Sequence, residues 1–211
     1  MGLLLIEQAF NGLQFGVMLF LIAAGLTLVF GIMDLVNLSH GSLVMVGAYL
    51  ATTLIEWTGS FILGILFALP STFLVGVVVE IVVLRTLYER DHLDQVLATF
   101  GLILFFNELI RIVWGPASLY SGLPESISGH VEILPGAPYP AFRLLIILVG
   151  LLVALLIYFI VARTKLGMLI RAGASNREMA GALGVNIRML FTLVFGLGAV
   201  SYTHLTLPTK A

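Results

Sequence analysis

Polar residues that could do chemistry gather in one interruption of an otherwise apolar chain. Residues 34–42 separate two apolar runs, and they contribute four candidate side chains: Asp34, Asn37, Ser39 and His40. Asp34 and His40 are six residues apart, and in a broken helix such a carboxylate and imidazole could converge as an acid–base pair of a membrane enzyme. One histidine and one aspartate do not complete a catalytic set, so we assign no catalytic residue.

Two other interpretations of this polar break stay open. Non-helical backbone at membrane depth is tolerated only beside protein or a water-filled cavity, so the four side chains could line the path of a transported substrate. The break could equally be a cytosolic turn, because Asp, Asn and Ser commonly cap the helices on either side of a turn.

A second segment, residues 163–188, carries the charge that orients the chain. It holds five basic residues against one acid, Glu178, between two apolar runs; the basic residues are Arg163, Lys165, Arg171, Arg177 and Arg188. An excess of Lys and Arg beside membrane spans marks the cytoplasmic side. We therefore expect this loop in the cytosol.

The same loop contains the signature of a short helix. Ser175 and Glu178 have the spacing of a capping box, and Gly184 is suited to end the helix in left-handed geometry. This predicts a helix from Asn176 to Leu183. About two turns cannot hold themselves in water, so the helix needs a surface to dock against.

The predicted helix offers a small apolar face for such docking. Met179, Ala180 and Leu183 fall on one side at helical spacing, as expected of a helix that fits a groove in a soluble partner. The alternative is an ordinary basic connector, whose charges only fix the topology.

Composition assigns the class of protein. The chain is 60% hydrophobic and 10% charged, with a mean hydropathy of +1.14, values typical of an integral membrane protein. It has no cysteine, which excludes disulfides and thiolate metal sites. We expect neither a metal site nor a bound cofactor in this chain, and no nucleic-acid partner.

Apolar runs predict an all-α polytopic bundle of about five to six spans with a polar break after the first. The expected spans are residues 10–33, the short run 43–55, 61–84 with Pro70 inside, 96–113, 142–162 and a final run from 189. With the basic loop inside, residues 85–94 are inside and 115–141 form an irregular outside loop. Glu108 and Arg111 are expected to pair on one helix face.

The last run, 189–200, covers only about 18 Å, less than the roughly 30 Å of hydrocarbon in a bilayer. Residues 201–211, SYTHLTLPTKA, are not apolar enough to complete the crossing. We therefore expect residues 1–200 to be the N-terminal part of a transmembrane permease domain and 201–211 to be a non-native tail.

The two segments together resemble a known family. FNGLQFGVMLFLIAAGLTLVFGIMDLVNLSHGSLVMVGAYLA, residues 10–51, is similar to the opening of the branched-chain amino-acid ABC transporter permeases. RTKLGMLIRAGASNREMAGALGVN, residues 163–186, resembles the cytoplasmic coupling loop of that family. The resemblance implies an importer subunit in the bacterial plasma (inner) membrane. The resemblance also implies that this subunit pairs with a second permease, two cytosolic ATPases and an extracytoplasmic binding protein.

The resemblance strengthens the docking hypothesis for the basic loop, while the substrate-pathway candidates come from the polar break itself. ATPase coupling is expected at Arg171, Ser175, Glu178, Met179, Ala180, Leu183 and Gly184, and the substrate pathway at Asp34, Asn37, Ser39 and His40. The chain has no P-loop motif, GxxxxGK[ST], so ATP would bind to the partner. Related permeases for urea or short-chain amides make those the alternative substrates, and a purely structural membrane subunit is the remaining class.

Overall fold

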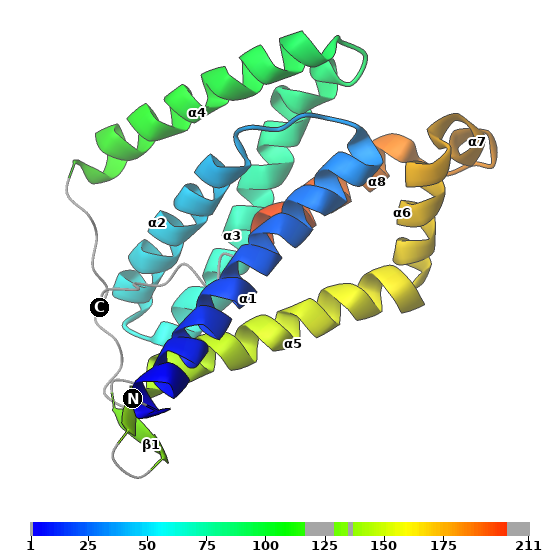
Figure 1. Ribbon diagram of the computed structural model, residues 1–211. Helices are drawn as coiled ribbons and strands as arrows, with labels where there is room; N and C mark the ends of the chain where they lie inside the picture. The colour runs from blue at the N-terminus through cyan, green and yellow to red at the C-terminus, as the bar shows by residue number, and fades with distance from the viewer. Residues whose placement is uncertain (1, 117–128, 135–136, 202–211) are drawn as a thin grey trace.

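A computed structural model describes residues 2–116, 129–134 and 137–201 of the chain. In chain order the elements are α1 (Gly2–Met33), α2 (His40–Thr58), α3 (Phe61–Val82), the 3-10 turn η1 (Leu84–Leu87), α4 (His92–Trp114), β1 (His130–Leu134), β2 (Ala137–Pro140), α5 (Ala141–Arg163), α6 (Lys165–Ser175), α7 (Arg177–Ala182) and α8 (Ile187–Val200). Figure 1 shows α1, α2, α3 and α8 side by side, with α4 and α5 at the edges.

Four of the described helices, α1, α3, α4 and α5, are long and apolar enough to cross a membrane. The shorter α2 has 19 residues, and α8, with 14, is about 21 Å long. The predicted all-α membrane bundle is confirmed, although α1 begins eight residues before the predicted start. Residues 202–211, which hold nearly all of the expected non-native tail, lie outside the described part of the chain.

Polar contacts join the connections between helices at two opposite ends of the bundle, so the connections form two groups. In the first group, the Val36 N–H donates to the Gln95 side chain over 3.3 Å, which joins the break after α1 to the start of α4. In the second, the Trp114 indole donates to Thr53 over 2.7 Å, which joins the far ends of α4 and α2. Figure 1 shows that these groups occupy opposite ends of the bundle, with α7 at the end of the first. The sequence predicts residues 85–94 and 163–188 on one side of the membrane and 115–141 on the other. The two groups of connections agree with this alternation.

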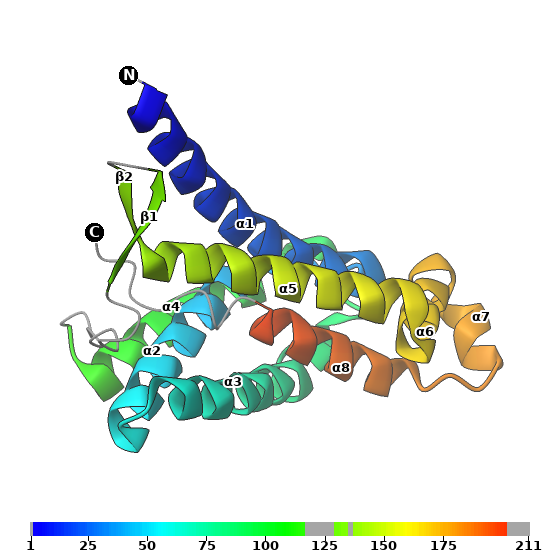
Figure 2. The ribbon, with the colours of Figure 1, turned by 90° about the horizontal axis from the view of Figure 1, so that it is seen from below.

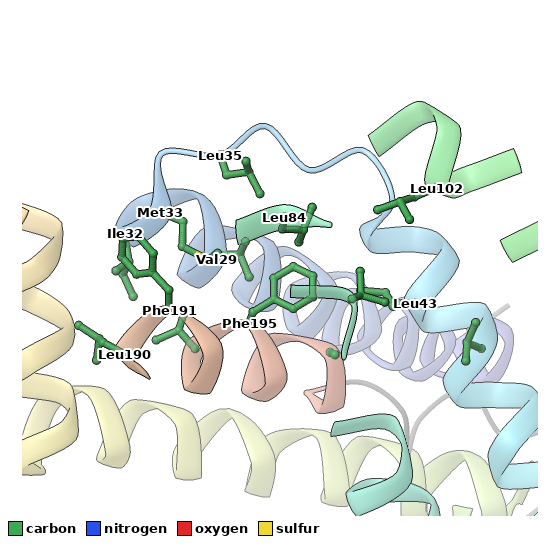
Figure 3. Packing of buried hydrophobic residues seen from close by; sticks show 14 of the residues in the cluster. Val29, Ile32, Met33, Leu35, Leu43, Leu84, Leu102, Leu190, Phe191 and Phe195 are labelled. Carbon is green, nitrogen blue, oxygen red and sulfur yellow. The ribbon is translucent and has the colours of Figure 1, made fainter. Parts of the chain in front are cut away.

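The main hydrophobic core lies at the end of the bundle that carries the first group (Figure 3). It is built from buried side chains of α1, α2, α3, α4, α6, α8, η1 and the polar break, among them Val29, Met33, Leu43, Leu84, Leu102, Phe191 and Phe195. Helix α8 is central to this core because it packs on both α1 and α3. These neighbours cover its buried side chains, which include Leu190, Phe191, Val194 and Phe195.

Small residues let α8 approach its neighbours closely. A Cβ on Gly25 would lie 3.1 Å from the carbonyl oxygen of Gly198, so α1 and α8 cross almost backbone to backbone. On the other flank, a Cβ on Gly76 of α3 would lie 3.0 Å from the Cβ of Ala199. By contrast, a Cβ on Gly12 or Gly16 would meet no described atom within 4 Å. Of the small residues in α1, Gly25 therefore makes the close crossing.

The segment between α4 and α5 differs from the irregular loop that the sequence predicts. Strands β1 and β2 pair antiparallel, with Val131 opposite Tyr139. Tyr139 stacks on Phe10 of α1 with ring centroids 5.6 Å apart, and Arg143 donates to Asn11 over 2.7 Å. The hairpin is thus held against α1 and the start of α5, as Figure 2 shows.

Candidate functional site

The polar break runs from Asp34 to Ser39 as a non-helical connection between α1 and α2. Asp34 has a φ of 51°, and it is the one non-glycine residue with a positive φ in the described part of the chain. Aspartate tolerates this left-handed region better than most side chains do. Its exposed carboxylate lies 3.7 Å from the guanidinium of Arg177 in α7. This ion pair joins the two segments that the sequence singles out.

Asn37 and Ser39 form the buried part of the break. The Asn37 Oδ1 accepts hydrogen bonds from the Ser39 N–H over 3.0 Å and from the Ser39 hydroxyl over 2.6 Å. Both side chains are buried. The Asn37 Nδ2 has no hydrogen-bond partner among the described residues, and burial without a partner is costly for an amide. The break is therefore a turn in geometry, yet it places polar groups inside the bundle rather than in solvent.

His40 opens α2 and lies away from Asp34. Its imidazole is buried, and a Cβ on Gly25 would approach it to 3.4 Å, which places it beside the α1–α8 crossing. Asp34 is instead exposed and paired with Arg177. The hypothesis of an Asp34–His40 acid–base pair is wrong for this geometry, because one partner is buried and the other faces outward. The described residues also contain no group of three or more His, Cys, Asp or Glu that could hold a metal ion.

The basic loop contains two helices where the sequence predicts one. Helix α6 (Lys165–Ser175) precedes α7, and Ser175 ends α6 rather than capping α7. The cap of α7 is Asn176, whose side chain accepts from the Met179 N–H over 2.8 Å. The predicted capping box is therefore wrong by one residue. Asn and Ser are comparable N-caps, and α6 continues through Ser175.

The end of α7 follows the prediction. Gly184 has a φ of 88°, and the N–H groups of Gly184 and Val185 donate to the carbonyls of Gly181 and Ala180. This pair of bonds is a Schellman motif, which satisfies carbonyls left over at the helix end. Asn186 then caps α8 by accepting from the Met189 N–H over 3.1 Å. Helix α7 is thus closed by the Asn176 side chain at its start and by backbone hydrogen bonds at its end.

The three residues of the predicted apolar face do not share one side of α7. Met179 is 60% exposed and Leu183 is 78% exposed, whereas Ala180 is buried at 4%. Ala180 therefore faces this chain's own fold. Glu178 is exposed in the first turn. Arg171 lies on α6, and its guanidinium donates to the Val161 carbonyl at the end of α5.

A buried carboxylate that the sequence analysis missed lies near the same end of the bundle. Glu80, in the last turn of α3, is 0% exposed. It forms an ion pair with Arg85 at 3.1 Å and accepts hydrogen bonds of 2.7 Å from both the Tyr88 hydroxyl and the Thr192 hydroxyl. The network connects α3 and the turn after it to α8.

These contacts explain how a charge is tolerated inside the bundle. Burial and the adjacent Glu80 carboxylate raise the pKa of Tyr88 above its usual value, so the phenol stays protonated and donates. The signal was present in the sequence, because an ionisable residue in an apolar run is expected to have a partner and Arg85 follows five residues later. Thr192 could not be found in this way, because it is 112 residues distant.

Comparison with known proteins identifies the family. Residues 8–201 match the family described as "Branched-chain amino acid transport system / permease component". The chain belongs to this permease family. Its members are transport proteins, so the chain is a multi-pass membrane protein with a role in transport. No solved structure matches it at a significant level.

Three curated relatives illustrate the similarity. The high-affinity branched-chain amino acid transport system permease protein BraD of Pseudomonas aeruginosa is 28% identical over 207 residues, which cover 92% of this chain and 67% of the relative. The permease protein LivH of Escherichia coli K12 is 27% identical over 208 residues, with the same two coverages. A probable branched-chain amino acid transport permease protein LivH of Methanocaldococcus jannaschii is 28% identical over 185 residues, which cover 81% of this chain and 55% of the relative.

Proposed function

We propose that this permease is a membrane subunit of an ATP-driven importer of branched-chain amino acids in the bacterial plasma membrane. Its partners are a second permease, two cytosolic ATPases and an extracytoplasmic binding protein. The substrate is supported by the printed names of the relatives, which are branched-chain amino acid transport permeases. The energy comes from the ATPases, since this chain has no P-loop.

Helix α7 is the ATPase-docking element, and its exposed side chains are the observation that carries this proposal. Met179 is largely exposed on the six-residue α7, and Leu183 is largely exposed at its C-cap. Such a helix needs support beyond its own hydrogen bonds. The chain supplies that support through the Asn176 cap, the Gly184 end and the buried Ala180. The outward side chains then remain available to a groove on the ATPase.

The Asp34–Arg177 pair connects this docking element to the substrate pathway. A displacement of α7 by the ATPase would move Arg177 and thereby act on Asp34, which is the first residue of the polar break. The same break carries the buried Asn37 and Ser39, and the buried His40 follows it as the first residue of α2. We place the substrate pathway along these buried groups, because a discontinuous helix can present its polar terminus to a passing substrate.

Site-directed cross-linking tests the docking proposal. The chain has no native cysteine, so Leu183→Cys introduces one thiol on α7, and Thr86→Cys places a matched exposed thiol on η1 at the same end of the bundle. In membranes that hold the complete importer, a short bifunctional thiol reagent should join Leu183→Cys, and not Thr86→Cys, to a cysteine-bearing ATPase subunit. If neither variant or both cross-link equally, α7 is not the docking element.

A matched uptake assay separates the substrate alternatives. Reconstituted importer should accumulate labelled leucine, isoleucine or valine when ATP is supplied. Uptake of urea or acetamide in place of these amino acids would assign the alternative substrate class. Turnover of substrate by the purified permease alone would contradict the transporter proposal.

A further inference from the structure

The bend between α5 and α6 concentrates positive charge at one point. From residue 133 to residue 177 the chain has no aspartate or glutamate. Arg163 is the last residue of α5, and Lys165 is the first residue of α6. Both side chains belong to exposed residues. The bend thus presents two cations with no acidic residue nearby in the sequence to neutralise them.

The packing of α6 against α5 fixes this bend. The Thr164 side chain caps α6 by accepting from the Gly167 N–H over 3.2 Å. Gly167 lies so close to the end of α5 that a Cβ there would collide with the carbonyl oxygens of Ile160 and Val161. Arg171 also donates to the Val161 carbonyl, which adds a third cation beside the bend. The free N–H groups at the start of α6 contribute further positive potential.

An apolar groove extends from this cationic bend along the outer side of α5. It has a volume of about 880 Å³ and is lined by Leu152, Val153, Leu155, Leu156, Tyr158, Phe159 and Arg163. Arg163 is its one charged lining residue. α5 packs on α1 and α6, and Figure 1 shows it along one edge of the bundle with α6 at its far end. The groove therefore faces the surroundings of the bundle and not its core.

We propose that this groove binds an anionic phospholipid of the cytoplasmic leaflet. One acyl chain lies along Leu152, Leu155 and Phe159, and the phosphate lies at Arg163 and Lys165, close to the start of α6. Charge complementarity favours this occupant, because each cation near an anionic lipid surface contributes attraction. The apolar lining requires an acyl chain, which free phosphate lacks. The cationic bend belongs to the predicted cytosolic loop, so the leaflet follows from the topology.

Native mass spectrometry of the purified full chain tests the lipid site. Phosphatidylglycerol, or phosphatidylcholine with the same acyl chains, would be titrated into the detergent-solubilised protein. We expect phosphatidylglycerol adducts to form at much lower concentration than phosphatidylcholine adducts. The double variant Arg163→Gln/Lys165→Gln should lose about tenfold or more of the phosphatidylglycerol affinity. The control Arg90→Gln/Arg111→Gln removes the same charge elsewhere and should bind normally.

A second variant tests the acyl-chain part of the site without altering charge. Leu155→Trp fills the groove and should weaken binding of phosphatidylglycerol, whereas excess glycerol phosphate should not compete in the wild type. Equal binding of the two lipids, normal binding by Arg163→Gln/Lys165→Gln, or full competition by glycerol phosphate would each overturn the proposal. Loss of all adducts when the second permease joins the complex would also overturn it, because a protein would then cover the groove.

Discussion

The Asp34 carboxylate lies 3.7 Å from the Arg177 guanidinium, across 143 positions of sequence. Asp34 directly follows α1 in left-handed geometry, and Arg177 begins the short helix α7. Both side chains are substantially exposed, so the pair contributes little to stability, on the order of 0.2–1 kcal/mol. The pair matters instead for position, because it is a polar link between α7 and the break that carries Asn37 and Ser39 and leads into His40.

Reversal of one charge in this pair should impair transport more than it impairs folding. Arg177→Glu places two anions together, so α7 loses its link to the break and ATP-driven uptake should fall several-fold while the thermal midpoint changes little. The double variant Asp34→Arg/Arg177→Glu restores the attraction and should recover most of the uptake. Uptake by vesicles and ATPase activity would be measured together. Failure of the double variant to recover uptake, although its thermal midpoint equals that of the wild type and the left-handed backbone at position 34 is therefore retained, would show that the pair does not transmit coupling.

Loss of Arg85 should destabilise the bundle, because it leaves the Glu80 charge buried without its cation. We expect Arg85→Met to cost roughly 2 kcal/mol, less than the about 3–5 kcal/mol of a fully buried pair, because the Arg85 side chain is 36% exposed. Glu80→Gln removes the charge and should cost less. The double variant Glu80→Gln/Arg85→Met should regain part of the loss. Thermal unfolding in detergent measures the stability of the three variants. If the losses of the two single variants simply add in the double variant, the two residues are not coupled.

The α1–α8 crossing should tolerate no side chain at Gly25. Gly25→Val would push a branched side chain against the Gly198 carbonyl and the His40 imidazole, at a cost of about 1–3 kcal/mol from overpacking. Gly16→Val is the matched control on the same helix, because a Cβ at Gly16 meets nothing within 4 Å. Detergent-solubilised protein should show a lowered unfolding temperature for Gly25→Val alone. Equal behaviour of the two variants would disprove the close crossing.

The sequence is sufficient to predict the membrane class, the long apolar helices and the short helix α7. Apolar runs and basic loops follow from the hydrophobic effect and from the positive-inside rule, and both act locally along the chain. The predicted left-handed geometry at Gly184 is confirmed for the same reason, since a helix end depends on adjacent residues. Adjacent cap residues are harder to distinguish: the capping-box spacing favours Ser175, whereas Asn176 makes the bond.

Long-range contacts account for the other features in which the structure differs from the sequence-based expectations. No local pattern indicates that Ala180 faces inward, that Thr192 meets Glu80, or that Asp34 meets Arg177 and not His40. These pairs depend on how α8 and α7 fold back onto α1 and α3. The roles of the polar break in the substrate pathway and of α7 in coupling stay predictions.

Thiol reactivity tests the substrate pathway directly. Ser39 is 0% exposed in this chain, so Ser39→Cys should be shielded in the permease alone. If the break borders the pathway, a small water-soluble thiol reagent should modify Ser39→Cys in the assembled importer during ATP turnover, and excess leucine should slow the modification. Trp57→Cys, at an exposed residue, is a positive control for labelling. Constant protection of Ser39→Cys in all states would favour a structural turn.

ATP-driven leucine uptake tests the coupling role of α7 directly. The proteoliposomes would contain the complete importer with Leu183→Asp in this permease. Leu183 is 78% exposed, so the substitution should leave the permease folded and inserted. It should nevertheless reduce uptake at least tenfold, because a charge would enter the groove of the ATPase. The control Thr86→Asp, on η1, should transport normally. Wild-type uptake by Leu183→Asp, with the ATPase still bound, would contradict the claim that α7 couples this permease to ATP hydrolysis.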